Sequence, residues 1–152
     1  MPLDPPMSAS ASLIPIVEQA EGFLPTIGSD EGNPVIGFGC DLSASEVEHY
    51  QTIQPITRDE GVDLLMARIV PVEHVINRLI NVPITQNQFD ACCDFVYNEG
   101  SGHFASSTLL KLMNLGRMED AANEFLKWDI AGGQVFPGLL ARRQAERALF
   151  LT

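Results

Sequence analysis

The sequence is short of cysteine and of long apolar runs, and each shortage excludes a class of protein. It contains three cysteines, an odd number that is too small for a disulfide framework. Two of them, Cys92 and Cys93, are adjacent inside an apolar segment, so we expect buried, reduced thiols. No apolar run approaches the roughly 20 residues that a membrane-spanning helix needs, so we expect no insertion into a membrane.

Basic residues are also scarce. The chain has 9 Lys and Arg against 20 Asp and Glu, for a net charge of −11. Binding to nucleic acid requires clustered Lys and Arg, so the composition argues against a nucleic-acid partner. The charge is uneven, at −8 over residues 1–57, −4 over 58–100 and +1 over 101–152. Only the last third could therefore face an anionic partner.

Signals for a metal site and for secretion are missing as well. His49, His74 and His103 share no ligand spacing with one another or with the cysteines, so we expect no metal and no cofactor. The first 12 residues contain no positive charge and no apolar block, so we expect no secretory signal there. We expect residues 1–12 to form a flexible lead-in.

Helical periodicity dominates what is present. Apolar residues between 13 and 20 fall on one helical face, and Gly22 would end this helix just after Glu21. Turn-forming residues from 25 to 39 predict a small twisted hairpin, in which the apolar positions are Val35, Ile36 and Phe38. The Ser43–Glu46 pair could cap a short helix through Tyr50.

The rest of the chain reads as a series of capped helices. Residues 57–81 predict a long helix that acts as a spine, which Pro71 would kink or split. Further helices are predicted over 85–100, from Ser106 or Ser107 to 116, over 118–128 and over 137–151, with a loop at Gly132-Gly133. The fold class is therefore α+β and mostly helical, with one small β element near the N-terminus and no internal repeat.

Two carboxylic acids, Glu21 and Asp30, lie on either side of the first predicted turn. A carboxyl group at the C-terminus of a helix faces the negative end of the helix dipole, which favours the protonated form that a general acid needs. Asp30, on a polar turn, would stay ionised. Two carboxyl groups in unlike environments can break a glycosidic bond, although two solvated surface acids would give the same pattern.

Several segments in order carry a family resemblance. Glu21-Gly22-Phe23, Asp30 and the run 36–39 form the first, and segments 82–91, 104–110, 124–128, 131–138 and 142–147 follow it. Together they resemble the phage-type lysozymes, or endolysins, over roughly residues 13–151. The resemblance implies a two-lobed lysozyme-like fold, with a small N-terminal β-hairpin lobe (about 13–56), a connecting helix (about 57–81) and a helical C-terminal lobe (about 82–152).

The resemblance also implies an activity, namely hydrolysis of the β-1,4 bond between N-acetylmuramic acid and N-acetylglucosamine in bacterial peptidoglycan. Glu21 would then protonate the leaving oxygen, and Asp30 would orient the attacking water or stabilise the transition state. Tyr97 and Ser107 match positions that line the sugar cleft in this family, although Tyr97 also ends an apolar stripe and Ser107 could cap a helix. The enzyme would be held in the host cytoplasm before its release to the cell wall. We expect it to be a monomer.

Departures from the family pattern leave alternatives open. Val35 stands where the family usually has a Thr that helps to hold the nucleophilic water, and the interval from Asp30 to this position is one residue shorter. Cys40 stands where a His is common. A lytic transglycosylase that uses Glu21 alone is one alternative, and a catalytically impaired glycan-binding or structural module is another. A secreted toxin or a phage tail component would be delivered differently from an endolysin.

Three arginines near the C-terminus complete the candidates. Arg142, Arg143 and Arg147 lie within the predicted last helix. They could meet the acidic peptide stems of peptidoglycan, and a solvated helix face would explain them equally well.

Overall fold

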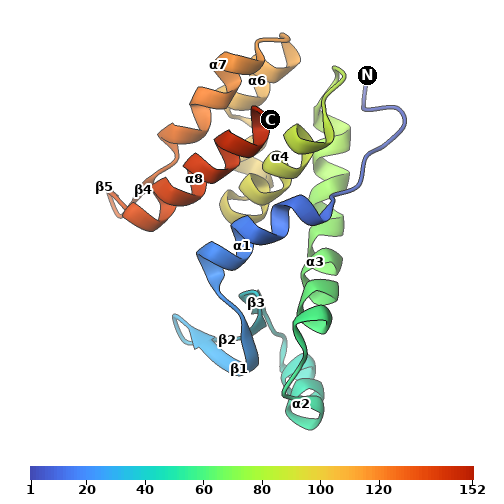
Figure 1. Cartoon of the computed structure of the whole chain (residues 1–152), viewed down its shortest axis with the longest axis vertical. Coiled ribbons are helices and arrows are strands. Elements are labelled where there is room, and N and C mark those ends of the chain that lie inside the picture. Colours follow the sequence, from blue (N-terminus) through green and yellow to red (C-terminus); the bar gives the residue numbers. More distant parts are fainter. The chain divides into compact units, whose positions relative to one another are not determined.

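The computed structural model describes residues 1–152 and divides into two compact units. Residues Val17–Arg68 form the first, called here the sheet unit. Residues Met1–Ile16 and Ile69–Thr152 form the second, called the helical unit. Figure 1 follows the chain through both of them.

The sheet unit contains a small antiparallel sheet and one short helix. Its three strands, in the order β1-β2-β3, are Leu24–Asp30, Asn33–Gly37 and Cys40–Asp41, and α2 (Ala44–Ile53) follows. The hairpin predicted over residues 25–39 is confirmed, and β3 extends it. Ser43 and Glu46 form the expected capping box, and α2 continues three residues beyond Tyr50. Ile36, Leu42 and Ile56 are buried at the centre of this unit.

The pairing of β1 with β2 is irregular near the start of the hairpin. Leu24 lies opposite Gly37 and Gly28 lies opposite Val35, so four steps along β1 match two steps along β2. Extra residues of this kind bend a strand and increase its twist. β2 itself continues in regular register to β3, with Val35 opposite Asp41 and Ile36 opposite Cys40.

Two helices pass from one unit to the other. A short 3₁₀ turn, η1 (Ala11–Leu13), leads into α1 (Ile14–Glu21), and α3 (Arg58–Leu79) is the long helix predicted as a spine. Of the two effects expected of Pro71, a kink or a split, the split is excluded because α3 is continuous through Pro71. Ile69 and Ile76, on either side of the proline, are fully buried, and this packing offsets the hydrogen bond that Pro71 cannot donate.

The helical unit is built from short helices around α4 (Gln86–Glu99). They are α5 (Ser101–Ala105), α6 (Thr108–Asn114), α7 (Met118–Glu124) with the 3₁₀ turn η2 (Phe125–Lys127), and α8 (Pro137–Phe150). α4 packs against α8, and α6 packs against α7 (Figure 1). The predicted capping box Thr85–Gln88 is present. Of the two serines that were candidates for the α6 cap, Ser107 is the one that caps it.

Two details of this unit differ from the prediction. The loop at Gly132-Gly133 is the turn of a second two-stranded sheet, formed by β4 (Ile130–Ala131) and β5 (Gln134–Val135). The expectation of a single β element was therefore wrong. The segment 101–105, for which no element was predicted, forms α5.

Aromatic rings and sulfur atoms fill the interior of the helical unit. The Phe95 ring lies within 5.4–6.2 Å of the ring centroids of Phe104, Phe125 and Trp128. Cys92 and Cys93 are buried free thiols, as predicted, and Cys40 is also a buried free thiol in the sheet unit. Burial raises the pKa of the Cys92 and Cys93 thiols, so both stay protonated.

The N-terminal residues, predicted to be a flexible lead-in, contact α3 and α4 within the helical unit. The Leu3 amide donates to the Asn77 carbonyl, and Met7 exchanges two hydrogen bonds with the Asn77 side chain. Ser10 donates from its amide and its hydroxyl to the buried carboxylate of Asp90. None of the helices is both long and apolar enough to cross a membrane.

Candidate functional site

Glu21 is the last residue of α1. The helix ends there because Gly22 adopts a φ of 70°, a left-handed conformation that glycine adopts without strain. The Gly22 amide donates a 2.7 Å hydrogen bond to the Glu18 carbonyl, which closes the final turn. The predicted place of Glu21 in the last turn of the helix is therefore confirmed.

The Glu21 side chain lies against the β2–β3 turn. A Cβ atom built on Gly39 would be 2.9 Å from the Glu21 Oε2 atom and 3.2 Å from its Cβ and Cδ atoms. Such distances are shorter than ordinary van der Waals contacts. Gly39 also has a φ of 73°. Both the backbone conformation and the space taken by Glu21 therefore require glycine at position 39.

Asp30 lies at the other end of the same sheet. It is the last residue of β1, its Cα pairs with that of Asn33, and its side chain is exposed. The two turn residues, Glu31 and Gly32, have φ values of 47° and 88°. Two positive values in succession are typical of a type I′ turn, which matches the twist of the flanking strands.

The two candidate acids lie beside turns at opposite ends of β2, so the length of this strand separates the two turns. Glu21 lies beside the β2–β3 turn and Asp30 beside the β1–β2 turn. From Gly37 to Asn33, β2 takes four steps, which at about 3.3 Å per residue is roughly 13 Å. The structure therefore places Glu21 beside one end of the sheet and Asp30 at the other end.

Val35 lies between them on β2. Its side chain is 3% exposed and belongs to the core of the sheet unit. At this position a hydroxyl group would replace a buried methyl group. Val35 was predicted as one of the apolar positions of the hairpin, and its burial agrees with that prediction.

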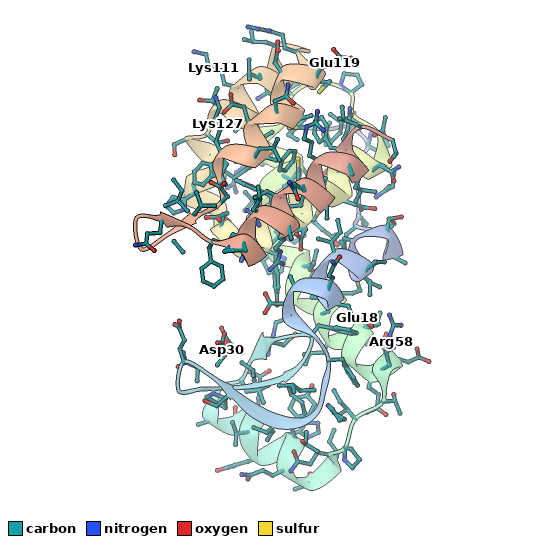
Figure 2. The ribbon with its side chains drawn as sticks, turned by 60° about the vertical axis from the view of Figure 1, so that its left-hand side comes forward. Glu18, Asp30, Arg58, Lys111, Glu119 and Lys127 are labelled. Carbon is teal, nitrogen blue, oxygen red and sulfur yellow. The ribbon has the colours of Figure 1, made fainter.

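The charges of the sheet unit are almost all negative. Residues 17–68 contain ten acidic side chains and two arginines, Arg58 and Arg68. Arg58 forms an ion pair with Glu18 at 3.0 Å, and Arg68 forms one with Glu46 at 2.6 Å (Figure 2 shows Glu18, Arg58 and Asp30). The hydrogen bond from Arg58 lowers the pKa of Glu18. The backbone amide of Ser43, followed by Arg68, lowers the pKa of Glu46.

The other two predicted site residues belong to the helical unit. Tyr97 is on the last turn of α4 and is half-buried. Ser107 is buried, and its hydroxyl donates a 2.7 Å hydrogen bond to the Phe104 carbonyl and accepts one of 3.1 Å from the Leu110 amide. The capping role that was weighed for Ser107 is thus present, and contact with substrate at either residue stays a prediction.

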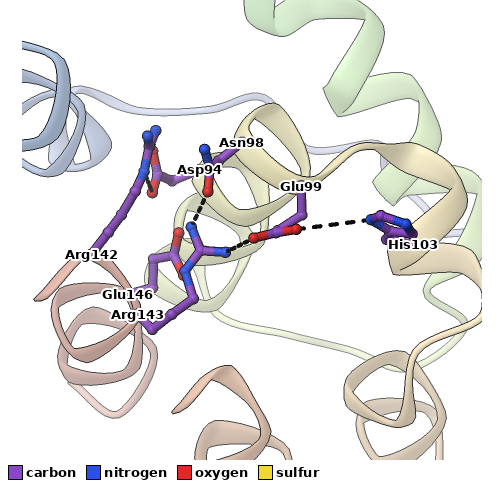
Figure 3. Close-up of polar contacts among 7 residues, drawn as sticks. All are labelled: Asp94, Asn98, Glu99, His103, Arg142, Arg143 and Glu146. Carbon is purple, nitrogen blue, oxygen red and sulfur yellow. Dashed lines mark hydrogen bonds and ion pairs between the residues drawn. The ribbon is translucent and has the colours of Figure 1, made fainter. Parts of the chain in front are cut away.

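One sequence interpretation placed the arginines of α8 on a solvated helix face. For the first two, Arg142 and Arg143, this interpretation is wrong. Arg142 and Arg143 are 5% and 0% exposed, because their guanidinium groups turn inward toward α4 (Figure 3). Arg142 donates two hydrogen bonds, of 2.9 and 2.7 Å, to the Asp94 carboxylate. Arg143 contacts Asn98 at 2.6 Å and the Glu99 carboxylate at 3.3 Å. Neither guanidinium therefore projects from the surface toward an acidic peptide.

A third carboxyl group, that of Glu146, completes this buried cluster. Its Oε2 atom lies 3.0 Å from the Nε atom of Arg143. Burial, together with the nearby Asp94 carboxylate, raises the pKa of Glu146 well above its usual value. Burial by itself would raise the pKa of Asp94, but the hydrogen bonds from Arg142 and Glu146 and the charges of Arg142 and Arg143 together lower it. Arg147, the third of the predicted arginines, is half-buried and donates to Asn123 instead.

Two features of the site were missed from the sequence. The first is the contact of Glu21 with Gly39, for which the only signal was glycine on both sides of Phe38. The second is the ion pair of Glu18 with Arg58, which joins residues 40 positions apart. The structure contains no group of three or more His, Cys, Asp or Glu side chains that could hold a metal ion.

Comparison with known proteins identifies relatives over most of the chain. The family described as phage lysozyme matches residues 18–146. The endolysin of Salmonella phage P22 is 37% identical over 150 residues, which cover 96% of this chain and 99% of that protein. The endolysin of Bacillus phage B103 is 46% identical over 115 residues, which cover 76% of this chain.

Solved structures agree in fold. A crystal structure of a P22 lysozyme mutant superposes with a TM-score of 0.84 at 36% identity, and covers 96% of this chain and 99% of that one. The muramidase domain of SpmX from Asticaccaulis excentricus gives a TM-score of 0.80 at 31% identity, with coverage of 95% and 98%. The aligned part spans only 41% of the length of two curated relatives, the endolysins of Bacillus phages B103 and PZA.

Proposed function

The chain belongs to the phage lysozyme family, and from this premise we propose that it is a peptidoglycan hydrolase of the muramidase type. Its substrate would be the β-1,4 bond between N-acetylmuramic acid and N-acetylglucosamine. One observation carries the proposal, namely that the Glu21 carboxyl group is held in one place, at the end of α1 and against Gly39. A general acid needs such a fixed position to meet the leaving oxygen.

Glu21 would protonate the glycosidic oxygen as the bond breaks. The carboxyl group is carried by the last residue of α1, and this fixed position is what a general acid needs to reach the leaving oxygen. Asp30, exposed at the tip of the hairpin, would act as a carboxylate. Its charge would stabilise the oxocarbenium-like transition state or orient the attacking water.

The spacing of the two acids favours a water molecule as the nucleophile. Enzymes that form a covalent glycosyl intermediate hold their carboxyl groups about 5 Å apart, whereas those that use a water hold them about 6.5–9.5 Å apart. Here the two acids lie beside opposite ends of β2, and these ends, Gly37 and Asn33, are roughly 13 Å apart along the strand. The shorter separation would require both side chains to extend directly toward each other, so we assign Asp30 no nucleophilic role.

A lytic transglycosylase is the second candidate, and Val35 favours it. This residue is buried and has no hydroxyl group with which to hold a water. In a transglycosylase the 6-hydroxyl of the sugar attacks instead, so that Glu21 alone would be required. The products distinguish the two reactions, since hydrolysis leaves reducing ends and transglycosylation leaves 1,6-anhydro ends.

The test is to digest purified peptidoglycan with the wild type and with Glu21→Gln, and to analyse the fragments by mass spectrometry. We expect reducing-end muropeptides from the wild type and a loss of at least 100-fold in Glu21→Gln. Glu48→Gln, the same substitution at an exposed position on α2, is the matched control and should retain full activity.

A second variant, Asp30→Asn, separates the two reactions. Hydrolysis should fall strongly in this variant because a carboxylate is lost, whereas transglycosylation should continue. If the wild type and Glu21→Gln were equally inert but both bound to cell walls, the chain would instead be a glycan-binding module, and the enzymatic proposal would be wrong.

The same proposal covers the partner and the place of action. Peptidoglycan would be the only macromolecular partner of a monomeric enzyme, which would be held in the host cytoplasm and released to the wall at lysis. Four relatives are named SAR-endolysins, among them that of Escherichia phage Mu, at 37% identity over 91 residues.

A further inference from the structure

Arg58, the first residue of α3, contacts both of the elements that hold Glu21. Its first contact is with α1. The Nε and Nη2 atoms of Arg58 donate to the two carboxylate oxygens of Glu18, at 3.3 and 3.0 Å (Figure 2). Glu18 and Glu21 are three residues apart and lie on neighbouring positions of one helical face. The two-point contact therefore holds the final turn of α1, from which Glu21 projects.

The second contact of Arg58 is with the β2–β3 turn. The Cζ atom of Arg58 lies 5.7 Å from the centroid of the Phe38 ring, within the range of a cation–π interaction. Phe38 is the residue between Gly37 and Gly39, and Gly39 is the residue against which Glu21 packs. The guanidinium group of Arg58 thus contacts both the β2–β3 turn, against which Glu21 packs, and α1, which carries Glu21.

The packing between the β2–β3 turn and the first turn of α3 leaves little room for adjustment. The Phe23 and Phe38 rings are 5.1 Å apart. A Cβ atom on Gly61, in the first turn of α3, would be 2.6 Å from the Phe23 ring, and one on Gly37 would be 3.5 Å from the Gly61 Cα. The β2–β3 turn therefore sits directly on the start of α3, and a change at the start of this helix is transmitted to the turn.

We propose that Arg58 is a positioning residue for Glu21, which it fixes by clamping the last turn of α1 and the Gly37-Phe38-Gly39 turn together. The proposal rests on the proposed function, in which Glu21 is the general acid. The contribution of the clamp to stability is small, because the Glu18 and Arg58 side chains are 35% and 54% exposed and exposed ion pairs are weak. Its effect is on geometry.

The experiment compares Arg58→Gln and Glu18→Gln, and the double variant, with the wild type on peptidoglycan. We expect kcat to fall about tenfold in each single variant with KM nearly unchanged, because a displacement of about 1 Å can cost about 10²-fold in rate. The double variant should lose no more than either single variant, since both remove the same contact. Melting temperatures should change by no more than about 3 °C.

Two further variants serve as controls. Arg117→Gln removes the same charge from an ion pair of similar exposure, with Asp120 in the helical unit, and should keep the wild-type kcat. The charge swap Glu18→Arg with Arg58→Glu restores the ion pair but not the contact with Phe38, so we expect a partial recovery of kcat.

A spectroscopic readout tests the placement of Glu21 without relying on turnover. The side-chain carboxyl ¹³C resonance of Glu21 should shift in Arg58→Gln and stay in place in Arg117→Gln. If this resonance and kcat were both unchanged in Arg58→Gln, the positioning role would be refuted. A wild type as inert as Glu21→Gln would refute the proposed function alone, and the resonance of Glu21 would still decide whether Arg58 positions it.

Discussion

Replacing Gly39 by Ala should reduce both stability and activity, each for a separate reason. The new methyl group has two separate costs, and the structure allows each to be assigned. Gly39 has a φ of 73°, so an alanine there is strained by about 1–2 kcal/mol. For a chain of this length that corresponds to a fall in melting temperature of roughly 3–6 °C.

The second cost falls on Glu21. The added Cβ would lie 2.9 Å from the Glu21 Oε2 atom and 3.2 Å from its Cβ and Cδ atoms, where ordinary contacts begin at 3.4 Å. The Glu21 Cβ is close to the backbone, so rotation of the carboxyl group alone does not relieve the overlap. To relieve the overlap, the Glu21 side chain must move by about 0.5 Å. A misplacement of about 1 Å can lower the rate by about 10²-fold, so we expect kcat to fall about tenfold.

Gly116→Ala is the matched control for Gly39→Ala. Gly116 follows α6 with a φ of 75°, and a Cβ there would meet no atom within 4 Å. Both variants should therefore lose similar stability by differential scanning calorimetry, while only Gly39→Ala loses activity in the release of dye-labelled peptidoglycan fragments. The reasoning would be refuted if Gly39→Ala melted like Gly116→Ala and kept more than half of the wild-type kcat.

Two other substitutions test buried positions. The raised pKa of Glu146 means that the folded protein holds a proton that the unfolded chain releases above about pH 4.5, so this group lowers stability as pH rises. Denaturant unfolding of Glu146→Gln should therefore show a gain over the wild type that widens from pH 5 to pH 8, by up to about 1.4 kcal/mol per pH unit below the folded pKa, and the exposed control Glu119→Gln should show none. Val35→Thr should cost about 1–3 kcal/mol because it buries a hydroxyl, and mass spectrometry should find the same product ends as with the wild type; a change of products would mean that position 35 reaches the reacting sugar.

Local sequence signals predicted most of the fold, because caps and apolar spacing act over only a few residues. The capping boxes at Ser43 and Thr85 place the starts of α2 and α4 correctly. The elements that were missed are too short for such signals. α5 has the composition of a loop over Ser101–Ala105, and β4 and β5 are two residues each. None of the three is long enough to show a periodic pattern of apolar residues.

Partners distant in sequence were beyond the reach of this reasoning. The sequence placed the arginines of α8 on the surface because most of their partners are distant in sequence. Asp94, on α4, lies 48 positions before Arg142. Glu146, three positions after Arg143, is a partner on the same helix. The same limit applies to the candidate site. Glu21 could be placed at the end of its helix from Gly22 alone, but its contact with Gly39 depends on how the sheet folds back beneath α1.

The hairpin turn explains why Asp30 lies where it does. A type I′ turn holds two residues, and here Glu31 and Gly32 fill it, so Asp30 must pair with Asn33 and Gly28 with Val35. Side chains alternate along a strand, so inserting one residue before Val35 would either lengthen the turn or shift the register and turn each later side chain to the other face. The shorter interval from Asp30 to Val35 thus produces a tight hairpin that keeps Val35 in the core and Asp30 at an exposed tip. Glu21 is therefore fixed by packing against Gly39, whereas the Asp30 side chain is exposed to solvent.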